Sequence, residues 1–401
     1  MNVLIVSQYY PPENAAIPAA LARALTERGH CVRVLTGYPN YPEGRIFEGY
    51  RQRWRARERH DEVDVLRVPL FIDHSQSALR RMLNYASFAA SAATARRFAA
   101  GADVIYVYAT QMTPALGPWL WRLTGGAPYV LHVQDLWPDS ITGSSLVSAG
   151  RGAQVIDALL GPWLRAVYRR AADVIGIAPT MVATLVDRGV AQPRAHLVYN
   201  WAEEQDAAPP AYVPAADGTT RLLYAGNVGD MQDLETAVRA VHQARDAGVH
   251  LTIVGDGVAL LRVRELAEDL GATNVAFKGR VPSDQIGELY QQADFALVTL
   301  KDLPAFTGTI PSKFQAALAS GVPVITTVHG DLRNLVEQLG VGFTANAEDA
   351  ASLELALRSA AGCDQRERQA LRDRARNAYS SQFSRQAGTD AIATIIERAA
   401  R

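Results

Sequence analysis

The chain of 401 residues is 48% hydrophobic and has a formal net charge of −1, as expected for a fully folded globular protein. Its length exceeds what one hydrophobic core usually organises, so we expect two domains. The balanced charge gives no bulk attraction to nucleic acid, and no apolar run approaches the roughly 18 residues of a membrane span. The two cysteines form no motif, and the first strand starts at once without a basic signal region. We therefore expect a cytoplasmic protein with reduced thiols.

Apolar runs alternate with amphipathic stretches along the chain, which predicts strand–helix–strand units and an α/β fold with parallel sheets. In the first half, the expected strands are Val3–Gln8, Cys31–Thr36, Val63–Pro69, Val104–Tyr108, Tyr129–Val133, Val174–Ala178 and His196–Tyr199. The helices expected between them are Ala19–Glu27, Leu79–Phe98, Thr113–Leu123, Val155–Arg170 and Met181–Asp187.

Residues 201–220 are rich in alanine, proline and acidic residues and show no apolar period, which indicates a linker between domains. A second series of expected strands follows at Arg221–Ala225, Leu251–Val254, Val275–Lys278, Phe295–Leu300, Val322–Val328 and Phe343–Ala345. After about Ala350 only helices are expected. The pattern predicts two Rossmann-like domains, residues 1–200 and 221–384, each built on a parallel sheet.

The first strand is followed by Q-Y-Y-P-P-E-N, from Gln8 to Asn14, which contains no glycine. A dinucleotide-binding fold needs G-x-G-x-x-G at this position, so we exclude NAD and FAD. The segment suits a substrate rim with stacking aromatic rings. We expect Tyr9, Glu13 and Asn14 to bind an acceptor, and an ordinary prolyl turn is the alternative.

A second polar segment, H-V-Q-D-L-W-P-D from His132 to Asp139, lies at the end of another expected strand. Open α/β sheets bind ligands at the carboxyl ends of their strands. We expect His132 and Asp135 to be catalytic and to polarise an acceptor, and Trp137 and Asp139 to bind its sugar hydroxyls. A structural role on the strand is the alternative for His132.

Glycine-rich turns follow the strands of the second half. Gly226, Asn227 and Gly229 come directly after a strand, where glycines allow a ligand to approach the backbone. Backbone groups at Val281, after another strand, suit the edge of a base. The chain has no Walker lysine motif and no pair of aspartates separated by one residue, so we expect no metal and no other cofactor. If a diphosphate departs from this site, amides and cations must stabilise it in place of a metal.

The segment F-T-G-T-I-P-S-K-F-Q-A-A-L-A-S-G-V-P-V, from Phe306 to Val324, predicts a loop and then a helix that Ser312 opens, between two buried strands. Backbone N–H groups and a helix dipole meet a phosphate in this geometry. Of the 40 basic residues only Lys278, Lys301 and Lys313 are lysine, a compact point charge suited to a phosphate oxygen. We expect Lys301 and Lys313, which flank the loop, to bind a phosphate, with Lys313 also catalytic and Ser312 among the binding residues. Lys278 is expected to be an ordinary surface residue.

Arginines are concentrated in two regions of the first half. Five alternate from Arg51 to Arg59 around Trp54, and two pairs lie between Arg80 and Arg97. Basic residues beside aromatic ones suit an anionic membrane surface or a lipid diphosphate, so a peripheral position on the inner face of the cytoplasmic membrane is one prediction. A solvated arginine face is an equally weighted alternative.

Together these motifs resemble the retaining glycosyltransferases of family 4, which have the two-domain GT-B fold. The similarity is greatest to bacterial enzymes that build O-antigen, capsule or colanic-acid polysaccharide on a lipid carrier. The resembling stretches cover nearly the whole chain and are, in order, Y-Y-P-P-E-N, L-T-E-R-G-H-C-V-R-V-L-T-G-Y-P-N-Y-P-E-G, H-V-Q-D-L-W-P-D-S, Y-A-G-N-V-G, V-G-D-G, F-K-G-R-V-P and I-P-S-K-F-Q-A-A-L-A-S-G-V-P-V.

The resemblance implies that the second domain binds a nucleotide-diphosphate sugar and the first domain an acceptor. It also implies that the last helix, residues 385–401, crosses back to the first domain. Carried over by motif, Gly226, Asn227 and Gly229 lie near the diphosphate and Val281 lies by the base. The resemblance also implies that the phosphates are bound by backbone amides of the loop, those of Gly308, Thr309 and Ile310.

The sequence departs from the family pattern at two places. Most members have two glutamates eight residues apart, and those positions hold Gly308 and Ala316 here. The usual basic pair that holds the diphosphate is replaced by Asn227 and Gln232. We expect the two flanking lysines to replace the missing charge and Gln315 to take part of the ribose-binding role.

We therefore predict a retaining, metal-independent glycosyltransferase that transfers a hexosyl or N-acetylhexosaminyl group from a nucleotide-diphosphate donor, with UDP favoured. The predicted acceptor is a lipid-linked saccharide in cell-surface polysaccharide synthesis. Two alternatives remain from the sequence: an epimerase of GT-B fold that acts on a UDP-sugar, and a non-catalytic nucleotide-sugar-binding partner of another transferase.

Overall fold

The structure is a computed structural model of the chain and describes all residues except 74–76, 138–150, 203–211, 213–214 and 216–217. The chain forms two compact units. Unit 1 comprises Met1–Tyr199 and Gly388–Arg401, and unit 2 comprises Asn200–Ala387. Most of the predicted linker, residues 201–220, lies outside the described residues. In the part of the chain that the structure describes, no helix is long and apolar enough to cross a membrane.

Unit 1 is built on an eight-stranded sheet with the order β3-β4-β2-β1-β5-β6-β7-β8. Its strands are β1 (Asn2–Ser7), β2 (Cys31–Gly37), β3 (Ala56–His60), β4 (Val63–Val68), β5 (Val104–Ala109), β6 (Tyr129–Val133), β7 (Asp173–Gly176) and β8 (Ala195–Leu197). Its helices include α1 (Ala16–Glu27), α2 (Ala78–Ala93), α3 (Arg96–Ala99), α4 (Leu116–Leu123), α6 (Arg151–Arg170), α7 (Pro179–Asp187) and α15 (Arg385–Ala399). The central strand β1 is buried on both faces, which explains its unbroken apolar run.

The edge strand β3 is an element that the sequence analysis did not predict. It pairs antiparallel with β4 and contains two of the five alternating arginines. Glu58 of β3 forms an ion pair of 2.7 Å with Arg67, whose side chain is buried and lies over the ring of Tyr50. Apart from Ala56 this strand contains only polar and charged residues, so it shows no hydrophobic alternation, and charged residues are common on exposed sheet edges. The pairing with β4, and not a hydrophobic pattern, therefore explains why these residues form a strand.

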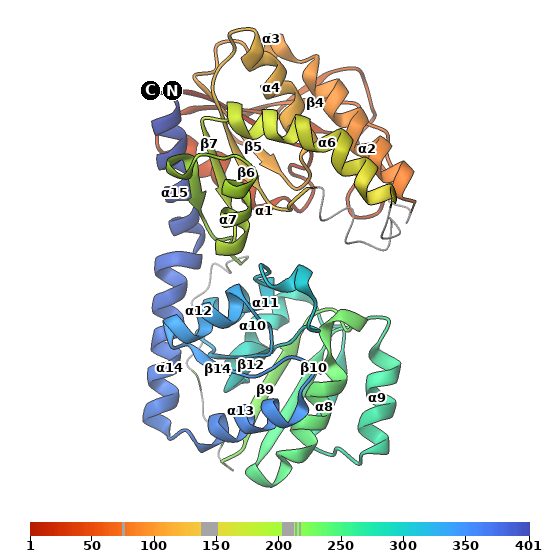
Figure 1. The fold of residues 1–401 in the computed structure, drawn as a ribbon, viewed down its shortest axis with the longest axis vertical. Helices are drawn as coiled ribbons and strands as arrows, with labels where there is room; N and C mark the ends of the chain where they lie inside the picture. The colour runs from red at the N-terminus through yellow and green to blue at the C-terminus, as the bar shows by residue number, and fades with distance from the viewer. Residues whose placement is uncertain (74–76, 138–150, 203–211, 213–214, 216–217) are drawn as a thin grey trace. The chain divides into compact units, whose positions relative to one another are not determined.

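The last helix, α15, belongs to unit 1 from Gly388 onward and packs along that unit (Figure 1). Arg28, at the end of α1, forms an ion pair of 2.5 Å with Asp390 of α15. Arg398, also on α15, contacts the buried carboxylate of Asp173 at 2.5 Å. These contacts attach the C-terminal residues to the first half of the chain, so the predicted return of the last helix is confirmed.

Unit 2 contains a six-stranded parallel sheet with the order β11-β10-β9-β12-β13-β14. Its strands are β9 (Thr220–Ala225), β10 (Val249–Val254), β11 (Val275–Gly279), β12 (Phe295–Val298), β13 (Val324–Thr326) and β14 (Gly342–Thr344). Its helices include α8 (Leu234–Gln243), α9 (Leu260–Asp269), α10 (Ser283–Gln292), α11 (Ser312–Ala319), α12 (Asp331–Leu339), α13 (Ala350–Gly362) and α14 (Gln365–Ala378). The predicted class, two α/β domains with parallel sheets, is confirmed.

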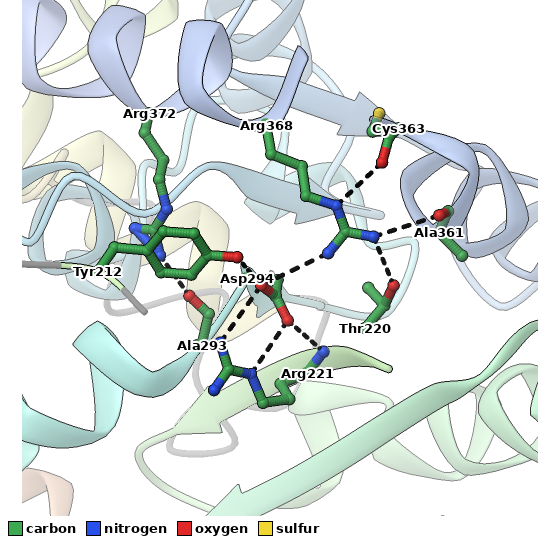
Figure 2. Close-up of polar contacts among 9 residues, drawn as sticks. All are labelled: Tyr212, Thr220, Arg221, Ala293, Asp294, Ala361, Cys363, Arg368 and Arg372. Atoms are coloured by element: carbon green, nitrogen blue, oxygen red, sulfur yellow. Dashed lines mark hydrogen bonds and ion pairs between the residues drawn. The ribbon is translucent and has the colours of Figure 1, made fainter. Parts of the chain in front are cut away.

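A buried carboxylate joins α14 to the sheet of unit 2 (Figure 2). Asp294 is 3% exposed and accepts a hydrogen bond of 2.7 Å from the Arg221 backbone N–H and another from the Tyr212 hydroxyl. Arg368 of α14 lies 3.4 Å from the same carboxylate, and the guanidinium of Arg372 lies over the Tyr212 ring at 3.6 Å. Removing the carboxylate would leave Arg221 and Arg368 without a counter-charge.

Candidate active site

The strand order of unit 2 indicates where a ligand binds. The chain moves outward from β9 to β10 and β11 on one side, and from β12 to β13 and β14 on the other. The switch point lies between β9 and β12, and open α/β sheets bind ligands outside the carboxyl ends of their strands at such a point. Two predicted segments begin here, the glycine turn after β9 and the long loop between β12 and α11.

The turn after β9 packs closely against its neighbours, and its first residue, Gly226, has no room for a side chain. Gly226 has φ of +141°, and a Cβ built on it would lie 2.4 Å from Cε of Lys313. A Cβ on Gly255, which follows β10, would lie 1.8 Å from the carbonyl oxygen of Gly226. Glycine is therefore required at both positions, and it allows α11 to bring Lys313 onto the end of β9.

Lys313 lies on a tyrosine ring at the switch point. Its ammonium group is 3.9 Å from the centroid of the Tyr224 ring and donates a hydrogen bond to the Tyr224 hydroxyl. That hydroxyl donates in turn to the carbonyl oxygen of Asn227 at 2.6 Å. Burial lowers the pKa of Lys313 to about 8, so the group is still mostly charged at pH 7. Among the described residues no carboxylate forms an ion pair with Lys313, and its charge is available to an anion.

Two amides occupy the positions of the usual basic pair. The Asn227 side chain donates to Oε1 of Gln232 at 3.2 Å, and the backbone N–H of Gly229 donates to the same oxygen at 3.0 Å. These bonds hold the turn in a fixed shape without adding charge. The structure thus brings together Gly226, Asn227, Gly229 and Lys313, all of them predicted donor-site or catalytic residues.

The loop before α11 rests on the turn that follows β13. The carbonyl oxygen of Thr307 accepts a hydrogen bond of 2.8 Å from the Asp331 N–H. Gly330 has φ of +74°, and a Cβ there would lie 2.1 Å from the same oxygen. Within the loop, the N–H of Thr309 donates to the carbonyl of Phe306 at 2.9 Å, so this predicted phosphate-binding amide already has an acceptor. Gly308 and Ile310 are half-buried beside it, and Ser312 is exposed at the first turn of α11.

The remaining predicted donor residues are more dispersed. Gln315 is only 4% exposed, and its buried Oε1 has no hydrogen-bond partner among the described residues. Lys301 lines a small polar pocket together with Gly229 and Asp233. Burial raises the pKa of Asp233, and the charge of Lys301 opposes that shift. Lys301 thus lies near a carboxylate, unlike Lys313, and Val281 is half-exposed after β11.

In unit 1 the predicted catalytic histidine is enclosed. His132 is 0% exposed, with Nδ1 at 2.5 Å from the Tyr106 hydroxyl and Nε2 at 3.0 Å from the Gln134 side-chain nitrogen. An amide nitrogen only donates, so Nε2 accepts and Nδ1 carries the proton. Burial lowers the pKa of His132 to about 3, which keeps the ring neutral. Asp135, three residues later, is an exposed residue, although burial still raises the pKa of its carboxyl group.

A buried glutamate organises the predicted acceptor rim. Oε1 of Glu13 accepts backbone N–H bonds from Asn40 at 2.7 Å and Tyr41 at 2.8 Å. Burial raises the pKa of Glu13, and its Oε2 has no hydrogen-bond partner within the described residues. The ring of Tyr9 lies 5.6 Å from the ring of Tyr41, which is 46% exposed. Glu13 therefore holds the backbone that presents this aromatic pair.

The other predicted acceptor residues differ in accessibility. Trp137 is 3% exposed, and its ring lies 6.0 Å from that of Tyr85, which leaves little of the indole for a sugar. Its carbonyl oxygen accepts a hydrogen bond of 2.6 Å from Arg188. Asn14 is exposed next to Glu13, while Asp139 lies outside the described residues.

Two tyrosines in these groups were missed by the sequence analysis. Tyr224 is a polar aromatic residue at the end of an apolar run, and Tyr41 lies within a stretch that was quoted only for its resemblance. The useful signal for Tyr224 is its place two residues before the glycine turn. In the described parts of the chain, no group of three or more His, Cys, Asp or Glu residues is placed to hold a metal ion.

Comparison with known proteins decides the family. The model named Glycosyl transferase 4-like domain matches residues 15–201, and the model named Glycosyl transferases group 1 matches residues 212–378. The chain belongs to the group 1 glycosyltransferases. WcaI of Escherichia coli K12, described as a colanic acid biosynthesis glycosyl transferase, is 29% identical over 378 residues, or 90% of this chain and 92% of that protein. WbjE of Pseudomonas aeruginosa, described as a glycosyltransferase, is 23% identical over 58% of this chain and 60% of its own.

Solved structures show the fold of this glycosyltransferase. HepE of Anabaena, solved in complex with UDP, has a TM-score of 0.69 at 16% identity and covers 99% of this chain and 100% of its own. Sucrose-phosphate synthase of Thermosynechococcus elongatus has a TM-score of 0.70 at 18% identity, with coverage of 99% and 98%. The GT-B fold that the sequence predicted is therefore confirmed.

Proposed function

We propose that this glycosyltransferase transfers a sugar with retention from a nucleotide-diphosphate donor to a lipid-linked saccharide in cell-surface polysaccharide synthesis. We favour UDP as the nucleotide. The printed description of WcaI, colanic acid biosynthesis, supports the pathway class, and the UDP complex of HepE supports the nucleotide. Unit 2 takes the donor in this proposal, and unit 1 takes the acceptor.

The environment of Lys313 is the observation that supports donor binding by unit 2 in this proposal. A half-buried ammonium group without a carboxylate partner among the described residues lies at the switch point, against Gly226. A buried cation is costly unless an anion compensates it. A diphosphate supplies that charge, and the bare glycine turn lets its oxygens approach the backbone.

The resemblance to retaining transferases supplies the transfer step of this proposal. The bond between the anomeric carbon and the phosphate oxygen breaks, and a bond to the acceptor oxygen forms on the same face of the sugar. The acceptor proton passes to the departing phosphate, so no carboxylate base is needed on that face. The positive charge of Lys313 stabilises the negative charge that develops on the phosphate, which is the role that cations and amides play in a preorganised site.

In the acceptor half, we propose that Tyr9 and Tyr41 stack on a sugar of the acceptor and that Glu13 positions them. The carboxyl group of Asp135, whose pKa burial raises, then remains as the candidate group for an acceptor hydroxyl. His132 acts as a positioning residue in this proposal, because its two ring nitrogens are bonded to Tyr106 and Gln134.

Calorimetric titration of the full chain with UDP tests the donor half. Lys313→Ala removes the charge at the switch point, whereas Lys278→Ala removes one from the exposed strand β11. We expect Lys313→Ala to weaken UDP binding by about 10- to 100-fold, since a hydrogen bond to a charged group is worth about 1.5–3 kcal/mol. Equal affinities for the two variants would contradict the proposed role.

The transfer itself is tested by supplying a sugar nucleotide with a bacterial lipid extract. Transfer of radiolabelled sugar to the lipid fraction is expected. Conversion of the donor without an extract would instead show the epimerase alternative, and nucleotide binding without any turnover would show the non-catalytic one.

A further inference from the structure

A polar group that the donor site does not use lies beside it, on the loops that follow three adjacent strands. Asp302 follows β12, His329 follows β13 and Glu348 follows β14. Nδ1 of His329 lies 3.3 Å from Oδ1 of Asp302, and the side chain of Asp302 is 60% exposed. Its carboxylate is thus open to solvent on one side and held by protein on the other.

The backbone of Asp302 is fixed as well as its side chain. Its N–H donates to Oε2 of Glu348 at 3.0 Å, and the next N–H, that of Leu303, donates to the carbonyl of Lys301 at 3.0 Å. The Glu348 N–H is bound in turn by the carboxylate of Asp233 at 3.2 Å. An ordinary surface aspartate needs no such framework, so this carboxylate is presented in a defined position.

The contacts of His329 determine its tautomer. Nε2 accepts a hydrogen bond from the Ala347 backbone N–H at 3.4 Å. The neutral ring then carries its proton on Nδ1, the atom that faces Asp302. Nδ1 of His329 therefore faces Oδ1 of Asp302 at 3.3 Å without forming a hydrogen bond to it, and this contact limits the positions of the carboxylate. The carboxylate keeps its capacity to accept hydrogen bonds from a hydroxyl donor.

This pair lies close to the position of a missing glutamate. Gly308 stands where most family members have their first glutamate. The residue before it, Thr307, is hydrogen-bonded to the turn of His329, Gly330 and Asp331, since its carbonyl accepts the Asp331 N–H at 2.8 Å. The loop between β12 and α11 thus lacks a carboxylate at Gly308 but carries one at Asp302, and its Thr307 contacts the turn that contains His329.

The spacing of the strands agrees with this placement. Val281 follows β11, Gly226 follows β9 and His329 follows β13. In the sheet, β9 lies two strands from β11, and β13 lies two strands from β9 on the other side. Two spacings are roughly 10 Å. A nucleotide sugar that lies along the sheet edge, with its base at Val281 and its diphosphate at Gly226, would extend its sugar toward β13.

We propose that Asp302, oriented by His329, binds hydroxyl groups of the donor sugar in place of the carboxylate missing at Gly308. This inference rests on the proposed function, because it takes the donor to be a nucleotide sugar. Asp302 is a specificity-determining residue and His329 a positioning residue. A carboxylate accepts hydrogen bonds from sugar hydroxyls, and charge-assisted bonds of this kind are the stronger ones.

The test compares bare nucleotides with sugar nucleotides in calorimetric titrations of the full chain. The ligands are UDP, UDP-glucose, UDP-galactose, UDP-N-acetylglucosamine, GDP and GDP-mannose. We expect Asp302→Asn to leave the affinity for UDP or GDP within about twofold and to weaken that for at least one sugar nucleotide by about 10-fold or more. The control Asp269→Asn removes a charge from the exposed last residue of α9 and should change neither affinity.

Variants at position 329 test whether His329 orients the Asp302 carboxylate or only supports the local structure. His329→Ala should lower sugar-nucleotide affinity without changing that for the bare nucleotide. His329→Asn, whose amide can donate from a place near Nδ1, should restore part of the loss. If Asp302→Asn binds every sugar nucleotide as tightly as the unchanged chain while bare nucleotide binding persists, the inference is overturned and the proposed function stands. If no nucleotide binds the unchanged chain, the proposed function fails, and the inference that rests on it fails too.

Discussion

The charge of Lys313 should make nucleotide binding depend on pH within an accessible range. Burial lowers the pKa of its ammonium group to about 8, so the proton is lost as the pH rises through that value. A diphosphate binds the protonated form better. The affinity should therefore be greatest below about pH 8 and fall above it, whereas a lysine with the ordinary pKa of about 10.4 would show no change there.

The size of the effect follows from the charged fraction. With a pKa of about 8, the Lys313 side chain is charged in roughly 0.9 of the molecules at pH 7.0 and in roughly 0.24 of them at pH 8.5. If only the charged form binds, the apparent Kd rises in inverse proportion to that fraction, by about fourfold over this interval. A bound anion stabilises the proton, so the complex should also take up protons from the buffer as it forms.

Calorimetry in two buffers of different ionisation enthalpy measures both quantities. The reference is Lys313→Met, which keeps a similar length but has no titratable group at this position. Its weaker binding should change little between pH 7.0 and 8.5, and any change that it shows belongs to the nucleotide or to other residues. Identical pH profiles for the two proteins, with no difference in proton uptake, would refute the assignment of Lys313 to the diphosphate.

Further predictions concern the surroundings of this site and the two units. Tyr224→Phe removes the hydroxyl that accepts from Lys313 and should weaken UDP binding by about 3- to 10-fold without unfolding the chain, as circular dichroism would verify. Gly226→Ala forces a Cβ against the same lysine at positive φ and should lower the free energy of unfolding by about 1–3 kcal/mol, with nucleotide binding lost; unaltered binding would argue against a close backbone approach. Asp294→Asn should cost unit 2 about 3–5 kcal/mol in urea unfolding, because Arg221 and Arg368 lose their carboxylate, and a loss below about 1 kcal/mol would show that the group is dispensable. Replacing the five arginines from Arg51 to Arg59 by alanine should abolish flotation with anionic vesicles and leave neutral vesicles unbound as before; a chain that never floats would remove the membrane prediction.

Much of the fold was predictable because local pattern and tertiary structure agree. The buried parallel strands appear in the sequence as unbroken apolar runs, such as the one from Val3 to Val6. The strand β3 was not predictable in this way. Its residues have no apolar alternation, and its position depends on pairing with β4 and on the contact between Glu58 and Arg67.

The positions of the loops in the candidate site were predictable from the sequence, whereas the contacts between its side chains were less so. The glycine turn at Gly226 and the helix start at Ser312 follow from local sequence. The contact of Lys313 with Tyr224 joins residues 89 positions apart, so one sequence alone does not reveal it. His132 illustrates the opposite case, because a polar residue at a strand end gives no sign of the tyrosines that enclose it.

The return of α15 to unit 1 has a consequence for synthesis on the ribosome. Unit 1 lacks its last helix until residues 388–401 have been made, whereas unit 2 is continuous from Asn200 to Ala387. At about 5–20 residues per second, the gap between residues 199 and 388 corresponds to roughly 10–40 s. During that time the buried carboxylate of Asp173 has no Arg398 beside it. All residues of the second unit are therefore made before the first unit is complete, and chains that stop short of α15 should be preferred substrates for chaperones and proteases.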